Sequence, residues 1–171
     1  MSHARSTLRG IDSFNAFSTA TADLPPLDLT AIGAAMAREA ELTKPHGSLG
    51  RLESLVAWLA GVQGRHPPRL DRAQITVFAG HHGVVAHGVS AYPAEVTGQM
   101  VASFLAGGAA INVLARHVGA RVVVLDVGVA SQLQPEPGLV IKKVAPGTAD
   151  MAMGPAMSRT QAINAIEAGI E

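Results

Sequence analysis

One segment of the chain, residues 121–128, reads Arg-Val-Val-Val-Leu-Asp-Val-Gly and is apolar at almost every position. Half-buried strands alternate apolar and polar residues, whereas strands buried on both faces of a parallel sheet are apolar without alternation. A second apolar run, residues 74–79, comes earlier, and helical sequence lies between the two. This order predicts parallel strands joined by a right-handed crossover. We therefore expect an α/β fold with a parallel, doubly wound (Rossmann-like) sheet.

The other elements follow from periodicity and capping residues. A helix is expected over residues 28–42 with Asp28 or Thr30 as N-cap, and another over 49–63 capped by Ser48. A helical stretch after Pro93 is expected to bend or split at Gly107-Gly108, and its second piece to end at Gly119. A short strand over 139–144 and a last helix that begins at Ser158, with Gln161 as its capping-box partner, complete the prediction.

These elements predict three regions. Residues 1–27 are expected to be a flexible N-terminal arm, residues 28–64 a small helical subdomain, and residues 72–171 the first part of an α/β domain. A doubly wound sheet usually has more strands than the three predicted here. We therefore expect the α/β domain to be incomplete.

Composition excludes several classes of function. Lys+Arg and Asp+Glu are balanced at 13 each, so no nucleic-acid footprint and no electrostatic membrane anchor is expected. The chain has no cysteine, which excludes thiol catalysis and thiolate metal sites. We expect no apolar run near the roughly 18 residues of a membrane span and no signal peptide. A cytoplasmic location is consistent with these features.

The loop after the first predicted strand is the strongest site candidate from the residues alone. Residues 80–93 follow the apolar run 74–79, and ligands in open α/β sheets bind at the carboxyl ends of the strands. The loop holds His81, His82 and His87, which could ligate a metal of the zinc type. Their spacing matches no H-E-x-x-H motif, however, and Glu95 is the only carboxylate nearby. Hydrogen bonds within the loop, and solvation, are therefore favoured over a metal site.

Asp126, near the end of the second buried strand, allows two interpretations. An acidic residue at this place can bind a ribose hydroxyl or assist catalysis, or it can cap a nearby loop. No G-x-x-x-x-G-K-[ST] loop and no G-x-G-x-x-G turn follows a strand in this chain. Nucleoside triphosphates and dinucleotides are therefore not expected as ligands.

Several separate segments together resemble one enzyme family. Residues 44–53 read Lys-Pro-His-Gly-Ser-Leu-Gly-Arg-Leu-Glu. This is similar to the K-P-x-G-S-L-G-x-L-E signature of the nicotinate-nucleotide–dimethylbenzimidazole phosphoribosyltransferase family of cobalamin synthesis. The resemblance covers about residues 28–171 and continues in the same order through residues 80–93, 104–115, 126–129, 147–150 and 154–159.

The resemblance implies transfer of phosphoribose from nicotinate mononucleotide to 5,6-dimethylbenzimidazole, which gives α-ribazole 5′-phosphate and nicotinate. It implies small-molecule substrates, no cofactor, no metal and a homodimer. Carried over by motif, the residues that bind substrate are His82, Gly83, Ser90, Tyr92 and Met100.

The chain departs from the family at two positions and in one whole part. The family commonly has Asp where His81 stands and Glu where His87 stands. It also has a second half with a general-base glutamate and a G-E-x-G-x-x-N segment, and nothing in residues 1–171 matches either.

The missing part decides what the resemblance implies about catalysis. Glu167 and Glu171 follow no such motif, so the family's general-base glutamate is expected to lie beyond Glu171. The resemblance therefore implies the base-binding part of the enzyme, with no catalytic residue identified in this chain. The alternative is a non-catalytic module for an azole or purine-like base, or a half-protein that depends on a partner.

Overall fold

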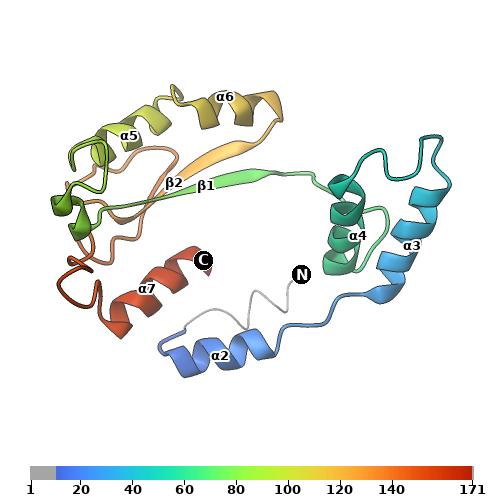
Figure 1. The fold of residues 1–171 in the computed structure, drawn as a ribbon, viewed down its shortest axis with the longest axis horizontal. Helices are drawn as coiled ribbons and strands as arrows, with labels where there is room; N and C mark the ends of the chain where they lie inside the picture. Colours follow the sequence, from blue (N-terminus) through green and yellow to red (C-terminus); the bar gives the residue numbers. More distant parts are fainter. Residues whose placement is uncertain (1–10, 171) are drawn as a thin grey trace. The chain divides into compact units, whose positions relative to one another are not determined.

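The computed structural model describes residues 11–170, and Figure 1 shows their helices and strands. The described residues form two units, one of residues 20–71 and one of residues 11–19 and 72–170. Each unit has its own apolar cluster. Helix α2, Phe14–Ala22, crosses the division between the units and lies inside the segment expected to be an arm. Residues 1–10 of that segment lie outside the described residues, and the three-region division stays a prediction.

The first unit is built on a pair of helices, α3 (Leu29–Ala40) and α4 (Arg51–Gln63). Small side chains, Ala31, Ala35 and Ala60, are buried between them, which allows the two backbones to approach closely. Asp28 is the N-cap of α3, and its Oδ1 accepts a hydrogen bond from the Ala31 N–H at 3.0 Å. The two predicted helices are therefore confirmed, and Asp28 rather than Thr30 caps the first.

The start of α4 differs from the prediction. Ser48 does not cap this helix, because the chain makes a turn through Gly47 (φ 73°) and Gly50 (φ 54°), and Gly50 is the N-cap. The Glu53 carboxylate takes over part of the capping, since its Oε1 accepts the Leu49 N–H at 3.1 Å. The prediction of Ser48 as the cap is therefore wrong.

The second unit contains a three-stranded parallel sheet in the order β1-β2-β3. Its strands are β1 (Gln74–Gly80), β2 (Arg121–Gly128) and β3 (Leu139–Ile141). The predicted α/β class and parallel pairing are confirmed. The third strand is shorter than predicted. Beyond the end of β3, the backbone N–H groups of Lys142 and Val144 still donate hydrogen bonds to β2.

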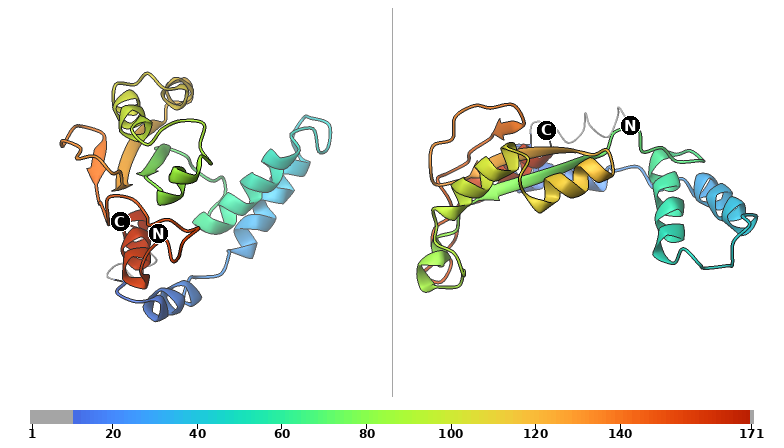
Figure 2. Two further views of the ribbon diagram at one scale, coloured as in Figure 1. Left: turned by 60° about the vertical axis from the view of Figure 1, so that its left-hand side comes forward. Right: turned by 90° about the horizontal axis from the view of Figure 1, so that it is seen from above.

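Helices cover both faces of this sheet. Helices α5 (Val96–Leu105) and α6 (Ala110–His117) lie on one face and α7 (Arg159–Ile170) on the other, as Figures 1 and 2 show from three directions. Val101 of α5 packs with Ala79 and Val124 in the core on the first face. The split at Gly107-Gly108 is confirmed, as is the end of α6 before Gly119, whose φ is 67°. The predicted capping box of α7 forms between Ser158 and Gln161.

The segment Val96–His117 is apolar and long enough, by length and composition, to cross a membrane. The expectation that no run approaches that length is therefore wrong for this segment. In the structure it is two helices of 10 and 8 residues that both contact the sheet. A 10-residue helix is about 15 Å long, roughly half the hydrocarbon thickness of a bilayer. The break between α5 and α6 thus gives two short helices that cover one sheet face.

Candidate functional site

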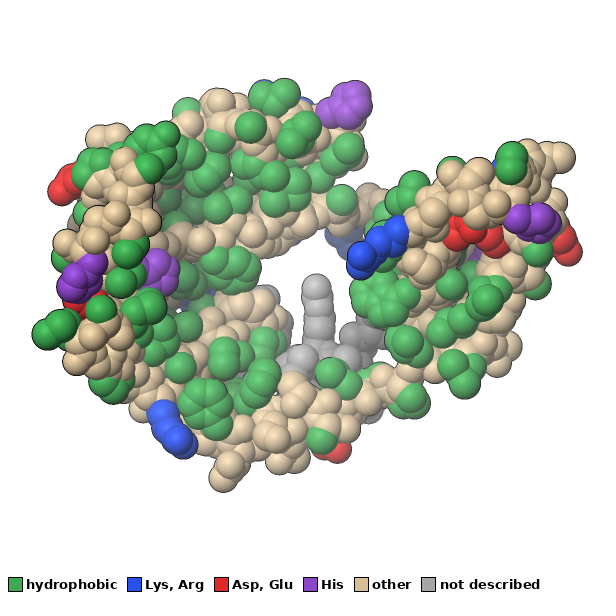
Figure 3. All heavy atoms as spheres, viewed as in Figure 1, with side chains coloured by type: hydrophobic (Ala, Val, Ile, Leu, Met, Phe, Trp, Pro, Cys, Tyr) green, Lys and Arg blue, Asp and Glu red, His purple; other side chains and the backbone are tan. Residues whose placement is uncertain are grey.

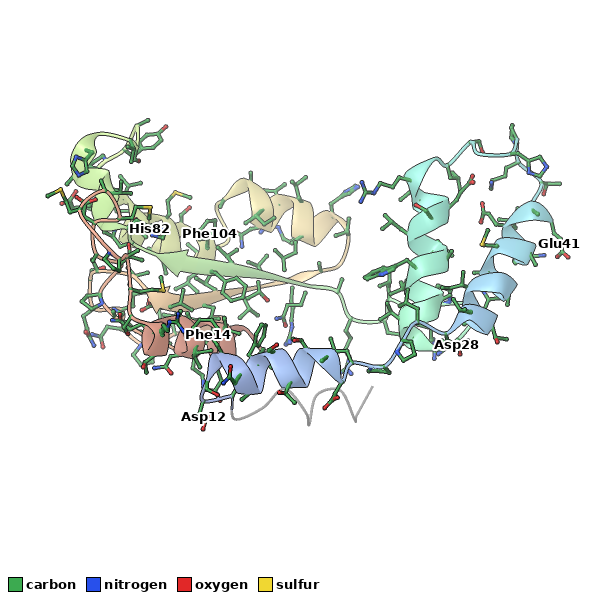
Figure 4. All side chains as sticks on the ribbon, turned by 60° about the horizontal axis from the view of Figure 1, so that its bottom comes forward. Asp12, Phe14, Asp28, Glu41, His82 and Phe104 are labelled. Atoms are coloured by element: carbon green, nitrogen blue, oxygen red, sulfur yellow. The ribbon has the colours of Figure 1, made fainter. Side chains whose placement is uncertain are left out.

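A cavity of ≈ 340 Å³ lies at the carboxyl end of β1, between the loop that follows the strand and helix α5. In Figure 4, His82 lies at the end of β1 and Phe104 on α5. Four of the five residues predicted to bind substrate line this cavity, namely His82, Ser90, Tyr92 and Met100. The loop and the helix thus bring together residues that are up to 18 positions apart (82 to 100) in the sequence.

The lining of the cavity suits a flat, largely apolar ligand. Val77, Val96 and Phe104 provide apolar walls, and Met100 adds a polarisable thioether. Tyr92, which also lines the cavity, is 68% exposed. Ser90, Thr97 and His82 are polar groups in the same lining, and a few such groups in an apolar pocket fix the orientation of a ligand.

The hydroxyl of Ser90 and the backbone of Tyr92 form a hydrogen-bonded turn at the outer wall of the cavity. Ser90 Oγ donates to the carbonyl of Tyr92 at 2.9 Å and accepts from the Tyr92 N–H at 3.2 Å. This local turn follows Gly88, whose φ of 70° favours glycine. Ser90 therefore fixes the path of the backbone at Tyr92, and one lone pair of its oxygen is left for a ligand.

Gly83 does not line the cavity but lies against the backbone of residues 148–150. Its N–H donates to the carbonyl of Thr148 at 3.1 Å. A Cβ at this position would lie 2.7 Å from the Asp150 nitrogen and 2.8 Å from the Ala149 carbonyl carbon. The close approach of two backbones thus explains this glycine, and its role in binding substrate stays a prediction.

His82 and His87 join the loop after β1 to the segment 147–150. His82 forms an isolated parallel bridge with Thr148, and its Nδ1 lies 3.4 Å from Thr148 Oγ1. His87 ends the 3-10 helix η1 (Gly83–His87), and its Nε2 lies 2.6 Å from Asp150 Oδ2. The backbone N–H of Ala152, and then His87, hold the pKa of Asp150 below its usual value. The histidine–carboxylate pair therefore contains an ionised Asp150 at neutral pH.

Asp126 is fully buried and caps the turn after β2. Its Oδ1 accepts the N–H groups of Gly128 at 3.1 Å and Val129 at 2.8 Å. Its Oδ2 lies 3.3 Å from Lys143 Nζ. Because its side chain is 0% exposed, the loop-capping interpretation fits the structure and the ribose-binding one does not.

Metal ligation finds no support among residues 11–170, where no group of three or more His, Asp or Glu side chains could hold an ion. His81, His82 and His87 instead belong to a loop that is bonded to residues 147–150.

The expected position of the general base is not tested by the structure. Glu171, beyond which the resemblance puts the family's general-base glutamate, lies outside the described residues. Glu167 belongs to helix α7 and does not line the cavity at the end of β1. The absence of a catalytic residue from this chain therefore stays a prediction.

A second, smaller cavity of ≈ 120 Å³ lies near the same strand end, on the side of α7. It shares Gly80, His81 and His82 with the first cavity, and Val127, Met157 and Ala165 are among its other lining residues. The end of β1 thus separates two cavities.

Phe104 and Thr97 were not predicted as site residues. Phe104 lies four residues after Met100 on α5, and both line the larger cavity. Residues at i and i+4 share a helix face, so the position of Met100 was the signal that could have identified Phe104. Thr97, three residues before Met100, follows from the same argument.

Comparisons with known proteins agree on one family. A family model described as phosphoribosyltransferase matches residues 24–171. The nicotinate-nucleotide–dimethylbenzimidazole phosphoribosyltransferase of Roseiflexus sp. (strain RS-1) is 58% identical over 153 residues, which are 90% of this chain and 43% of that protein. The protein of the same name from Chloroflexus aurantiacus (strain ATCC 29366 / DSM 635 / J-10-fl) is 59% identical over 145 residues, 85% of this chain and 41% of that protein.

A solved structure extends the comparison to the fold. The crystal structure of nicotinate-nucleotide–dimethylbenzimidazole phosphoribosyltransferase from Thermus thermophilus matches with a TM-score of 0.77 and 51% identity. The match covers 84% of this chain and 43% of that one. The chain therefore spans less than half the length of the relatives that it matches.

Proposed function

Since the chain belongs to the phosphoribosyltransferase family, we propose that it forms the base-binding part of a nicotinate-nucleotide–dimethylbenzimidazole phosphoribosyltransferase. The observation that carries this proposal is the apolar cavity at the end of β1, which His82, Ser90, Tyr92 and Met100 line together. The substrates would be nicotinate mononucleotide and 5,6-dimethylbenzimidazole, and the products α-ribazole 5′-phosphate and nicotinate.

The reaction depends on holding dimethylbenzimidazole in one orientation beside the ribose. A ring nitrogen of dimethylbenzimidazole attacks C1′ of the ribose, and the bond from C1′ to the nicotinate nitrogen breaks. That nitrogen is cationic in the substrate, so it leaves with the electron pair of the bond as a neutral pyridine. The other ring nitrogen of the base loses its proton to an acceptor. Holding the base against C1′ supplies a large part of the rate enhancement.

The cavity can hold a bicyclic base by its faces and edges. Phe104 and Tyr92 provide rings that can pack against a flat ligand, and the flexible side chain of Met100 can pack against the methyl groups of the ligand. Ser90 and Thr97 offer hydroxyl groups to the ring nitrogens. We propose that these contacts select an azole of this size and leave one nitrogen facing the open side of the cavity.

Among the described residues that line the cavity there is no carboxylate. Two histidines in the lining, His81 and His82, are the candidate proton acceptors. Asp126 is buried and bonded, and Glu95 is absent from the lining. We therefore propose that the acceptor comes from the part of the relatives' length that this chain does not span, and that the chain alone binds the base without efficient turnover.

Turnover and binding together test the proposal. The purified chain is incubated with nicotinate mononucleotide and dimethylbenzimidazole, and α-ribazole phosphate is sought by mass spectrometry while calorimetry measures binding of the base. Binding without product is the expected result. Product would mean that the chain contains its own catalytic groups, with His81 and His82 as the first to mutate. Neither binding nor product from a folded chain would contradict the proposed function.

A second candidate function rests on the 41–43% coverage of the relatives. The chain could serve as a non-catalytic module for an azole or purine-like base, or as a half-protein that works with a partner chain. Similar affinity for adenine and for dimethylbenzimidazole would favour the binding module. Turnover that appears on addition of the remaining segment of a full-length relative would favour the enzyme.

We also propose that the protein acts as a homodimer. Closed two-fold dimers are the commonest assemblies of soluble homo-oligomers. Large apolar side chains stay exposed on both units, among them Leu29, Trp58, Leu70 and Leu114, and Figure 3 shows hydrophobic atoms across the visible face.

A further inference from the structure

The loop that carries the cavity wall has few attachments to the rest of the second unit. From Gly88 to Tyr92, the hydrogen bonds that the structure shows are local: Gly88 N–H to Val85, and the two bonds between Ser90 and Tyr92. A segment held by local bonds alone opens at low free-energy cost. Its position over the cavity therefore depends on what holds the residues on either side of it, the end of η1 before it and the start of α5 after it.

The residues before it are fixed to the segment 147–150 at two places. At the start of η1, the Gly83 N–H bonds to Thr148, and the Thr148 N–H bonds to the carbonyl of His81 at 2.9 Å. At the end of η1, His87 Nε2 meets Asp150 Oδ2 at 2.6 Å. The second attachment is the nearer of the two to the cavity wall, since His87 directly precedes Gly88.

Asp150 is itself held in place. Its Oδ1 accepts the Ala152 N–H at 2.9 Å, while its Oδ2 accepts from His87. One carboxylate thus joins η1 to the turn at residues 150–152. The side chains of His87 and Asp150 are 46% and 24% exposed, so the pair is partly solvated and contributes modestly.

We propose that His87 and Asp150 are a pair of positioning residues, which hold the loop of residues 88–92 so that Ser90 and Tyr92 form the outer wall of the base-binding cavity. Neither side chain lines the cavity, so neither contacts the base. The proposal rests on the proposed function for the identity of the ligand, and on the geometry alone for the attachment of the loop.

The test compares His87→Ala, Asp150→Asn and the double variant with wild type and with His117→Ala, an exposed histidine at the end of α6. Hydrogen exchange of the backbone amides of residues 88–92 is measured without ligand, and the dissociation constant of dimethylbenzimidazole is measured by calorimetry. We expect exchange and dissociation constant to rise roughly two- to fivefold in each single variant, as for a partly exposed pair. The double variant should show little further change, because its two side chains act through one contact.

Two results would overturn the proposal. One is unchanged exchange of residues 88–92 in His87→Ala relative to His117→Ala. The other is a double variant whose effect equals the sum of the single ones. His87→Gln keeps a neutral N–H donor and should restore part of the wild-type protection of residues 88–92 from exchange. Such a rescue would show that the faster exchange in His87→Ala does not come from a general loss of stability. If wild type binds no base, the proposed function fails while hydrogen exchange still decides whether the pair holds the loop.

Discussion

At the scale of single residues, the loop after β1 is shaped by backbone contacts that leave no room for side chains. Gly83 lies against the backbone of residues 148–150 and makes a bond to Thr148 there. The sequence showed a glycine beside a histidine, but not its neighbours, which lie some 65 positions further on. Tertiary contacts of this kind leave no local pattern, so the neighbours of Gly83 could not be predicted from the sequence, whereas Phe104 and Thr97 follow from the helical spacing around Met100.

Replacement of Gly83 by alanine should destabilise the protein. The added Cβ would lie 2.7 Å from the Asp150 nitrogen, and a backbone atom cannot move aside as a flexible side chain can. We expect a loss of about 1–3 kcal/mol in the free energy of unfolding, as for other overpacked sites, measured by chemical denaturation. Gly154→Ala is the matched control, since no atom lies within 4 Å of a Cβ there. Equal stability of the two variants would contradict this account.

Lys44 shows how one residue can link two helices. Its Nζ lies 2.7 Å from Glu39 Oε1 and 2.6 Å from Glu53 Oε1, so it bridges the end of α3 and the start of α4. Hydrogen bonds to Glu39 and then Glu53 raise the pKa of Lys44 above its ordinary value, and Lys44 and then the Leu49 N–H lower the pKa of Glu53. The K-P-H-G-S-L-G-R-L-E segment thus has a structural role within the first unit.

The ion-pair cluster predicts a pH-dependent effect of Lys44→Met. The lowered pKa of Glu53 means that its contribution is present above its ordinary value of 4.5 and is lost as the pH falls through its folded value. The raised pKa of Lys44 means that its contribution is present below 10.5 and is lost at higher pH. The melting temperature of the variant should therefore fall furthest below wild type near neutral pH, and the difference should shrink below pH 4.5. A constant difference across this range, or an equal one in the exposed variant Arg51→Met, would contradict the cluster.

At the scale of elements, helix and strand interiors could be predicted from the sequence, whereas several ends could not. The apolar run of β2, the split at Gly107-Gly108 and the capping box of α7 each have a local cause, and each is confirmed. The start of α4 has no such local cause. The Glu53 carboxylate accepts the Leu49 N–H across the glycine turn, and Gly50 is the N-cap in place of the expected Ser48. A serine before a helix thus acts as its N-cap only where the backbone places the free N–H groups of the first turn within reach of its hydroxyl.

The two serines at predicted helix starts give a matched test. In α7, the Gln161 N–H donates to Ser158 Oγ at 3.1 Å, so Ser158→Ala should cost about 1 kcal/mol of unfolding free energy. Ser48→Ala should change it by less than about 0.5 kcal/mol, as at other surface positions. Chemical denaturation of both variants measures the contrast. A loss for Ser48→Ala as large as that for Ser158→Ala would mean that α4 starts differently from the structure.

At the scale of the whole molecule, large hydrophobic side chains are exposed on both units of the described residues. Among the described residues the sheet has three strands, and the chain covers 41–43% of the two relatives compared above. Where such side chains form a contiguous patch, the patch marks a surface that other protein covers. The incomplete α/β domain expected from three predicted strands stays a prediction.

Self-association follows from the same surface. We expect the purified chain to form dimers or larger assemblies in light scattering, with a fraction that rises with concentration, because burial of apolar surface drives association. A monodisperse monomer with one sharp, cooperative melt would contradict this expectation and would mean that the 171 residues form a self-sufficient domain.

The central claim, that the cavity at the end of β1 binds a flat azole base, is tested most directly by nuclear magnetic resonance. The ¹⁵N-labelled chain is titrated with 5,6-dimethylbenzimidazole, and backbone amide shifts are followed. We predict saturable shifts that cluster at His82, Ser90, Tyr92, Met100 and Phe104. No saturable shifts, or shifts confined to Val127, Met157 and Ala165 around the smaller cavity beside α7, would contradict the claim.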